Sequence, residues 1–157
     1  MNKIILPALA VILLLIIVAG YSDANNTTAE DSALTTIADV QQLNVAIAKG
    51  PVFVEIGTNR CPTCSVQKPI LADIANDYQG KASVLYINAD ETRSLAASFN
   101  IYSIPDMFVI VESNDDGYVY MGADGKITTD RNRARFIGLT SKGTLTDVLD
   151  AAIEYRQ

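Results

Sequence analysis

The chain has 157 residues and a formal net charge of −6, and it contains two cysteines and no histidine. The absence of histidine excludes Ser-His-Asp triads, Cys-His protease pairs and imidazole metal sites, and two thiols cannot complete a four-thiolate zinc site. The length suits a single domain, and the negative charge disfavours non-specific binding to nucleic acid or anionic lipid.

The N-terminal segment, residues 1–21, is typical of a membrane anchor or a signal peptide. Lys3 supplies a cationic start, and residues 4–20 form a run of 17 residues without a charge. As a helix this run reaches about 25 Å, close to the lower limit for crossing a hydrocarbon layer of roughly 30 Å. No Ala-x-Ala cleavage site stands out after it, and the run is long for a signal-peptide core, so the pattern favours an anchor, through residues 4–21, over a cleaved signal peptide. Both alternatives predict export, the first with a membrane-anchored domain and the second with a secreted or periplasm-like one.

Residues 22–33 have no apolar periodicity and are predicted to form a polar linker to a domain over residues 34–157. Asn25 and Asn26 each begin a glycosylation acceptor pattern, which is a weak signal, and the alternative is a plain polar spacer.

The first half of the domain alternates between strand and helix patterns. Residues 34–37 predict a short strand, and Asp39 is the expected N-cap of a helix over 40–48. The apolar run at 52–56, in which Glu55 is the one charge, predicts a central strand covered on both faces. Further along, we expect a helix over 62–78 with a kink at Pro69, a buried strand at 84–87 and a short helix at 92–99.

The second half predicts a strand at 107–111, a hairpin around Asp124-Gly125, a strand at 131–137 and a final helix with an apolar stripe from Leu145 to Ile153. This order of elements indicates an α/β sandwich with a mixed sheet.

Three arginines at alternate positions are predicted to share one face of the strand at 131–137: Arg131, Arg133 and Arg135. They could form a docking patch for an acidic partner. A solvated face balanced by Asp124 and Asp130 is the favoured interpretation.

Both cysteines fall in one C-x-x-C motif, Cys61-Pro62-Thr63-Cys64, at a predicted strand-to-helix junction. Cys61 is expected at the helix N-cap and Pro62 at the first helical position, where a missing N–H costs nothing. Unpaired N–H groups and the helix dipole then favour a thiolate on Cys61, and Arg60 adds a neighbouring cation. Cys64, one turn along and more enclosed, is expected to resolve a mixed disulfide on Cys61.

Two structural alternatives exist for this motif. An inert disulfide would stabilise the turn only weakly, because its loop of two residues removes little unfolded-state entropy. A metal site shared between chains is a weaker alternative. A C-x-x-C beside a βαβ pattern, in a chain without other cysteines, therefore favours redox function.

The sequence from Leu34 to the C-terminus resembles the thioredoxin family, and the resemblance rests on more than the cysteines. The family's buried acidic residue, six positions before the first cysteine, corresponds to Glu55. Its helix-kinking proline corresponds to Pro69, its cis-proline after an apolar residue to Ile104-Pro105, and its substrate-groove glycine to Gly138. Residues 136–145 match the family's last strand and the entry to its final helix.

Each match also has a physical interpretation. A carboxyl inside an apolar strand should have a raised pKa, which suits Glu55 to proton exchange near neutral pH, whereas an edge-strand surface residue is the alternative. For Pro105, single-sequence statistics favour an ordinary trans bond, and only the resemblance implies a cis bond.

The sequence also departs from the family's usual pattern. The tryptophan that usually precedes the first cysteine is replaced by Arg60, and the usual Gly-Pro between the cysteines by Pro62-Thr63. Asp106 follows the expected cis-proline, and a charge there would oppose thiolate formation. A lysine often found near the buried acid is replaced by Tyr86. The span from Pro105 to Gly138 is longer than in a minimal thioredoxin, which predicts an enlarged hairpin.

The resemblance implies a thioredoxin fold, with a central mixed sheet of about five strands flanked by about four helices and an enlarged late β-hairpin. It implies thiol-disulfide exchange on protein disulfides or dithiols, in which Cys61 attacks, Cys64 resolves and Glu55 relays the proton. The residues expected to contact the substrate are Arg60, Pro62, Thr63, Ile104, Pro105 and Gly138. No metal and no cofactor beyond the Cys61–Cys64 disulfide is expected, and no nucleic acid partner.

The favoured direction is reduction, which requires an electron donor of the reductase class. No histidine lies between the cysteines, and Asp106 would disfavour a strong oxidant. Two alternatives from other classes are a redox-inert, chaperone-like peptide-binding module and a thiol protein that transfers Cu(I).

Overall fold

The structure is a computed structural model and describes residues 34–157. The predicted anchor at 1–21 and the predicted linker at 22–33 lie outside the described residues. Within residues 34–157, none of the helices is both long enough and apolar enough to span a bilayer.

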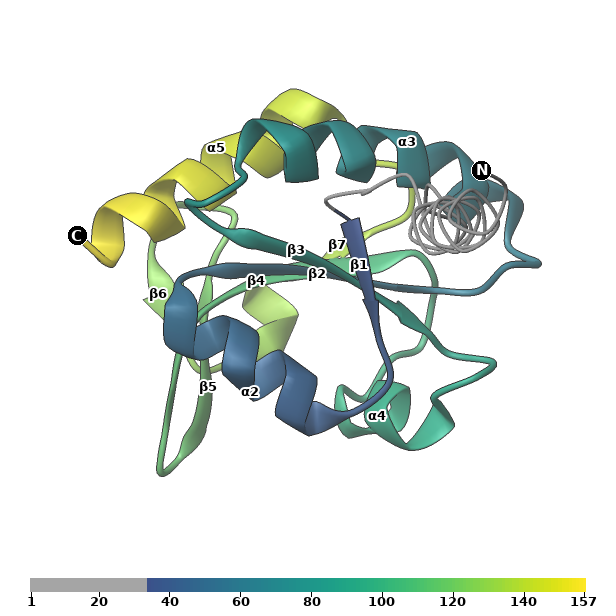
Figure 1. Cartoon of the computed structure of the whole chain (residues 1–157), viewed down its shortest axis with the longest axis horizontal. Coiled ribbons are helices and arrows are strands. Elements are labelled where there is room, and N and C mark those ends of the chain that lie inside the picture. The colour runs from purple at the N-terminus through teal and green to yellow at the C-terminus, as the bar shows by residue number, and fades with distance from the viewer. Residues whose placement is uncertain (1–33) are drawn as a thin grey trace, which may run out of the picture. The chain divides into compact units, whose positions relative to one another are not determined.

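A seven-stranded mixed sheet forms the middle layer of the domain (Figure 1). Its strands are β1 (Leu34–Ile37), β2 (Val52–Gly57), β3 (Ser83–Asn88), β4 (Asp106–Asn114), β5 (Gly117–Met121), β6 (Ile127–Thr128) and β7 (Phe136–Ile137). They lie in the order β1-β3-β2-β4-β5-β6, and β7 pairs with the start of β4. The pairs β1–β3 and β2–β3 are parallel, and all pairs from β4 onward are antiparallel.

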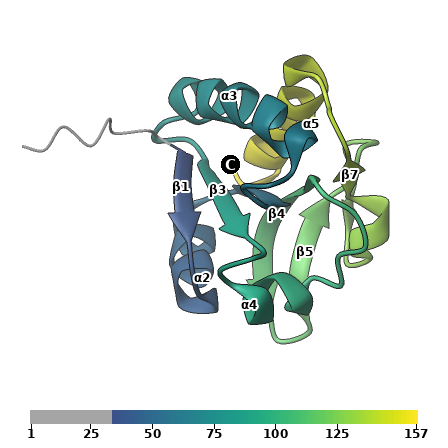
Figure 2. The ribbon, with the colours of Figure 1, turned by 90° about the vertical axis from the view of Figure 1, so that its right-hand side faces the viewer.

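Helices cover both faces of the sheet, so each face has its own apolar core (Figure 1, Figure 2). The helices are α2 (Val40–Lys49), α3 (Pro62–Asp77), α4 (Arg93–Ser98) and α5 (Lys142–Tyr155). Phe53 of β2 packs in the core with Leu71 of α3 and Leu145 of α5. Val54, the next residue of β2, packs in the opposite core with residues of α2 and α4. Every residue of β2 is buried, as predicted for a central strand.

The helices, strands and helix cap predicted for the first half of the domain are confirmed. Asp39 caps α2 by accepting a hydrogen bond from the N–H of Gln42 at 2.9 Å, and Gln42 accepts one from the N–H of Asp39 at 3.3 Å. Such a capping box satisfies two otherwise unpaired helix N–H groups. The strands at 34–37, 52–56 and 84–87 and the helices at 40–48, 62–78 and 92–99 lie within two residues of their expected ends.

The late part of the chain differs from the prediction in two ways. The sheet has seven strands rather than about five, because β5 and β6 continue from β4 as a meander with turns after Asn114 and around Asp124-Gly125. This meander confirms an enlarged hairpin region. The predicted strand at 131–137 is wrong for most of its length, since residues Arg131–Arg133 form a 3-10 helix and only Phe136–Ile137 is a strand.

Candidate redox site

The two cysteines lie at the junction between β2 and α3 and are joined by a disulfide. Cys61 is the N-cap of α3, and its Sγ atom accepts a hydrogen bond from the backbone N–H of Cys64 at 3.1 Å. Pro62 begins the helix, as predicted. The Cys61 sulfur therefore lies at the positive end of the helix dipole, an environment that stabilises a thiolate once the disulfide is reduced.

The two sulfurs differ in their access to solvent. Cys64 is fully buried, whereas Cys61 is partly exposed and Pro62 and Thr63 are exposed. An external thiol or disulfide can approach Cys61 from solvent, but it meets Cys64 only after displacing the surroundings of that residue. The pair thus has the asymmetry that an attacking thiol and a resolving thiol require.

Glu55 is buried in β2, which lies between β3 and β4, so the alternative of an edge-strand surface position is wrong. Neither of its carboxylate oxygens has a hydrogen-bond partner within the described residues. Burial raises the pKa of Glu55 from its ordinary value of 4.5 to about 7, and the positive charge of Lys68 opposes part of this rise. Near neutral pH the group is therefore able both to accept and to donate a proton.

Lys68 is a charged partner of Glu55 that the sequence analysis missed. It lies one helical turn after Cys64 on α3, and its Nζ atom is 4.1 Å from the centroid of the Tyr86 ring. Tyr86 is paired with Glu55 across β2 and β3, so the two side chains share a face of the sheet. The spacing of four residues between Cys64 and Lys68 was a usable signal, because residues so spaced on a helix lie on one side of it.

The Ile104–Pro105 bond is cis, as the resemblance implied. The β2–β4 register pairs Ile56 with Asp106, which places Pro105 beside Gly57 at the end of β2 that leads to the cysteines. The N–H of Gly138 donates to the carbonyl of Pro105 at 2.9 Å, and Gly138 has a φ of +81°. The fold therefore brings Ile104, Pro105 and Gly138 together at the dithiol end of the sheet.

A buried glutamine holds the segment after Gly138 against the redox helix. Gln67 of α3 is fully buried, and its Oε1 atom accepts a hydrogen bond from the N–H of Thr140 at 2.9 Å. This contact links the helix that carries the cysteines to the loop that carries Gly138. No periodic pattern predicts this contact, because the two residues are 73 positions apart.

Arg60, expected as a cation next to Cys61, forms an ion pair with Asp90 in the loop after β3. The Nη2–Oδ1 distance is 3.0 Å, and a second hydrogen bond joins Nε to the same carboxylate. The hydrogen bond and the negative charge of Asp90 raise the pKa of Arg60. With 84% of its side chain exposed, Arg60 contributes a surface charge beside the site rather than a buried contact.

The predicted arginine face is wrong, in both of its interpretations, because two of its members turn inward. Arg131 and Arg135 form ion pairs with the buried carboxylate of Asp106, at 2.8 Å and 2.5 Å, and their side chains are 11% and 4% exposed. Arg133 is exposed. The 3-10 turn at Arg131–Arg133 removes the period of two on which the predicted face depended.

The same contacts change the expected effect of Asp106 on the thiols. Its carboxylate is paired with two guanidinium groups, so its negative charge is compensated within the cluster. Arg131 also donates to the carbonyl of Phe99 at 2.7 Å, and Arg135 to that of Asn100 at 3.3 Å. The two arginines thus hold in place the segment that leads into the cis-proline. Because the charge of Asp106 is compensated, it no longer favours either direction of the reaction.

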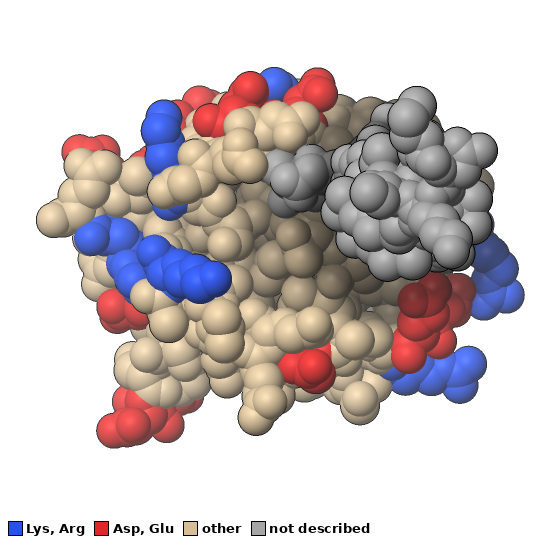
Figure 3. Space-filling view, in the orientation of Figure 1, with Lys and Arg blue, Asp and Glu red and all other residues tan. Residues whose placement is uncertain are grey.

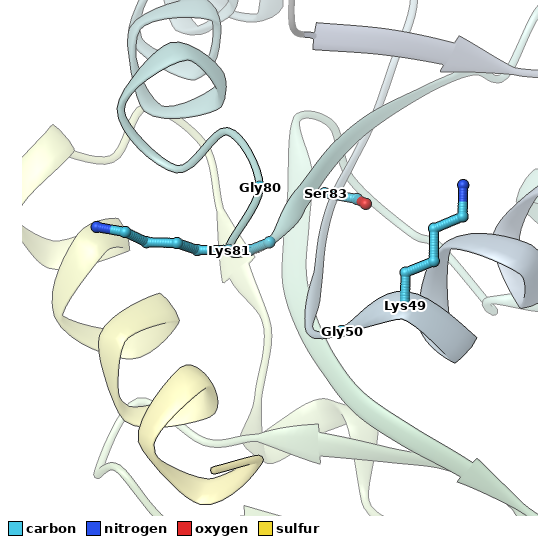
Figure 4. Close-up of a pocket in the computed structure, with 6 residues that line it drawn as sticks. Lys49, Gly50, Gly80, Lys81 and Ser83 are labelled. Carbon is cyan, nitrogen blue, oxygen red and sulfur yellow. The ribbon is translucent and has the colours of Figure 1, made fainter.

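A surface pocket lies at the other end of the sheet and contains none of these residues. It is lined by the end of α2 and the residue after it, Lys49 and Gly50, and by the turn that leads into β3, with Gly80, Lys81 and Ser83 (Figure 4). Figure 4 shows the two lysine side chains pointing away from each other, so they do not converge on a ligand. On the face seen in Figure 3, the visible lysines and arginines are interspersed with acidic residues.

Comparison with known proteins agrees with this geometry. A family model described as Thioredoxin matches residues 34–130. A thioredoxin of Pseudomonas aeruginosa is 29% identical over 110 residues, which are 70% of this chain and 86% of that protein. A thioredoxin of Staphylococcus saprophyticus is 38% identical over 63 residues, which are 40% of this chain and 61% of that protein.

Among solved structures, a mutant thioredoxin from Halobacterium salinarum superposes with a TM-score of 0.59 at 16% identity, covering 78% of this chain and 93% of that one. At this identity the likeness supports the fold alone, and it confirms the predicted α/β thioredoxin fold. The family model covers more than half of the chain, and the C-x-x-C pair lies within the matched residues. The chain therefore belongs to the thioredoxin family and is a thioredoxin-like disulfide oxidoreductase with a disulfide-capable Cys61–Cys64 pair.

Proposed function

We propose that this protein reduces disulfides in other proteins outside the cytoplasm, with Cys61 as the attacking thiol and Cys64 as the resolving thiol. The observation that carries the proposal is the position of the pair, in which a partly exposed Cys61 caps a helix and Cys64 is fully buried behind it. A helix N-terminus favours the thiolate that attacks, and burial reserves the second thiol for the intramolecular step.

The reaction proceeds in two exchanges. The Cys61 thiolate attacks one sulfur of the substrate disulfide, the substrate S–S bond breaks, and one substrate sulfur leaves as a thiolate. Cys64 then loses its proton to Glu55 and attacks the Cys61 sulfur, which releases the second substrate thiolate and leaves the Cys61–Cys64 disulfide. A separate electron donor, a dithiol reductase, restores the two thiols.

The substrate is a disulfide in an extended segment of another protein. Ile104, Pro105 and Gly138 lie together at the dithiol end of the sheet, where we expect them to contact this segment, and Pro62 and Thr63 are exposed beside Cys61. Arg60 contributes a positive charge at the rim, where the family usually has a tryptophan, and its partner Asp90 limits the reach of that charge.

The charges around the thiols support the proposed reducing direction. An oxidant needs a strongly stabilised thiolate, and a buried carboxylate such as Glu55 disfavours a second negative charge nearby. Lys68 supplies one cation near Glu55, and no histidine lies between the cysteines to add another beside the thiols. The location outside the cytoplasm rests on the uncharged run at residues 4–20 behind Lys3, which serves as a membrane anchor.

The exchange activity is tested with insulin as a disulfide substrate and with a Cys64→Ser trap. The protein is expected to accelerate insulin reduction by a small dithiol, and Cys61→Ser to abolish the acceleration. In the Cys64→Ser variant, mixed disulfides with substrate proteins are expected to accumulate on Cys61. Adding Cys61→Ser to this variant should prevent them. A wild-type protein that binds unfolded peptides but neither reduces insulin nor forms these adducts is a redox-inert binding module, and the proposal is then wrong.

The direction is tested separately by equilibrating the protein with glutathione buffers. We expect a potential closer to the about −270 mV of a reducing thioredoxin than to the about −120 mV of a strong oxidant. A value at the oxidising end would leave the exchange chemistry intact and reverse the direction.

A further inference from the structure

The Cys64 sulfur and the Tyr86 hydroxyl both face the position that a side chain of Gly57 in β2 would occupy. A methyl group built on Gly57 would lie 3.0 Å from the Cys64 Sγ atom and 3.2 Å from the Tyr86 hydroxyl oxygen. Cys64 is 0% exposed and Tyr86 is 2% exposed. A side chain at Gly57 would therefore collide with both groups, and its absence leaves the sulfur of α3 and the phenol of β3 facing the same point.

The Glu55 side chain lies on the same face of the sheet. It is paired in register with Tyr86 and lies two residues before Gly57 on β2, so the three residues share the face that α3 covers. Both Glu55 oxygens and the Tyr86 hydroxyl are buried without a hydrogen-bond partner among the described residues. Buried polar atoms are seldom left unpaired in native proteins, so these three atoms are available to bind a partner, such as a water molecule or a newly formed thiol. Reduction of the disulfide supplies one, because it turns the Cys64 sulfur into a thiol or thiolate.

The surroundings of Tyr86 keep its hydroxyl protonated. Its ring is faced by Lys68 of α3, and the charges that act on it are those of Glu55 on β2 and of Asp90 and Glu91 after β3. Burial, followed by these three carboxylates, raises the pKa of Tyr86 to about 12. A hydrogen-bond donor is therefore present next to Cys64 at every pH at which the dithiol works.

We propose that the Tyr86 hydroxyl connects Cys64 to Glu55: it relays the Cys64 proton to the carboxylate and then donates a hydrogen bond to the thiolate. This rests on the proposed exchange function. In the step, the Cys64 S–H bond breaks and its proton moves to the Tyr86 oxygen, while the original Tyr86 proton moves to a Glu55 oxygen. The thiolate then attacks Cys61, the bond between Cys61 and the substrate breaks, and the substrate sulfur leaves with the electron pair. Tyr86 ends the step unchanged.

The test separates the two exchanges in time. Reduced protein is mixed with an aromatic disulfide reagent that releases one coloured thiolate when Cys61 attacks and a second when Cys64 resolves. Tyr86→Phe keeps the ring beneath Lys68 and removes only the hydroxyl. We expect this variant to slow the second release by about tenfold or more and to leave the first release unchanged. The reason is that a hydrogen bond to a charged group, here the Cys64 thiolate, stabilises it more than a hydrogen bond between neutral groups would. The pH midpoint of the second release should also rise, measured between about pH 6 and about pH 9.

Tyr120→Phe is the matched control, because Tyr120 is buried in the core on the opposite face of the sheet. It should change neither release. If Tyr86→Phe equals the wild type in rate and pH profile, or slows both releases alike, the relay is refuted and the exchange function stands. If the wild type itself gives no second release, the proposed function fails, and the relay fails with it.

Discussion

A buried carboxyl group without hydrogen-bond partners makes stability depend on pH. Because the pKa of Glu55 is raised from 4.5 to about 7, the folded state keeps a proton that the unfolded state releases above pH 4.5. Stability contributed by this group is thus present below pH 4.5 and is lost as the pH rises through 7. We expect Glu55→Gln to stabilise the oxidised protein by about 2 to 3 kcal/mol at about pH 8 and far less at about pH 4.5.

Urea unfolding of the disulfide-bonded proteins at the two pH values measures this difference. Glu154→Gln is the control, since Glu154 is exposed near the end of α5, and it should not change the pH dependence. An equal gain for Glu55→Gln at both pH values would contradict a raised pKa and point to packing instead.

Gly138 and Gly143 allow a test of why glycine occupies a position, either because the backbone conformation requires it or because neighbouring atoms leave no room for a side chain. An added methyl group meets nothing within 4 Å at Gly138 or at Gly143, but only Gly138 has a positive φ, at +81°. Gly138→Ala should therefore destabilise by about 1 to 2 kcal/mol through backbone strain alone. Gly143→Ala, in the first turn of α5, should be neutral or stabilising by up to about 1 kcal/mol. Thermal unfolding of the two variants compares them, and a similar effect at both positions would contradict this account.

At the scale of elements, the Asp106 cluster joins the start of β4 to the segment that follows β6. Asp106 is fully buried, and its partners Arg131 and Arg135 are nearly so. Removing the carboxylate leaves two buried cations that repel each other, so Asp106→Asn should destabilise by about 3 to 5 kcal/mol in urea unfolding. Asp90→Asn removes the exposed pair with Arg60 and should cost less than about 1 kcal/mol. Comparable losses in the two variants would mean that burial does not set the strength of these pairs.

The elements that could be predicted are those whose signals are local. The buried strands, the cap at Asp39 and the helix start at Cys61-Pro62 each depend on residues within a few positions of one another. The strand predicted at 131–137 is wrong for most of its length because alternating arginines are typical of a strand face, whereas the distant Asp106 determines where two of them point. Periodicity carries no information about such a partner.

In the candidate site, too, some features could be predicted from local sequence patterns and others could not. The positions of the thiols and the burial of Glu55 could be read from local patterns, and the cis bond before Pro105 only from family resemblance. The roles of Lys68 and Gln67 required the packing of α3 on the sheet and on the loop after Gly138. Contacts between elements thus account for most of what the sequence did not predict.

At the scale of the whole molecule, the dithiol is also a reporter of location. The chain has two cysteines, both in the redox pair, so a thiol reagent labels this site and nothing else in the protein. Cys61 is partly exposed, and Cys64→Ser leaves it as the one reactive thiol. The proposed anchor at residues 4–21 predicts that this thiol faces the outside of the cell.

We therefore expect a membrane-impermeant maleimide to label Cys61 of the full-length Cys64→Ser chain in intact bacterial cells, after brief treatment with an impermeant phosphine to release adducts. The labelled chain should sediment with membranes, because an uncharged run of 17 residues behind a single lysine retains the segment in the bilayer. A chain that starts at residue 34 should be labelled only after lysis, which controls for leaky cells. Labelled protein recovered in the medium or the soluble extracytoplasmic fraction would favour a cleaved signal peptide. Labelling of the full-length chain only after lysis would overturn export, and the protein substrates would then have to be sought in the cytoplasm.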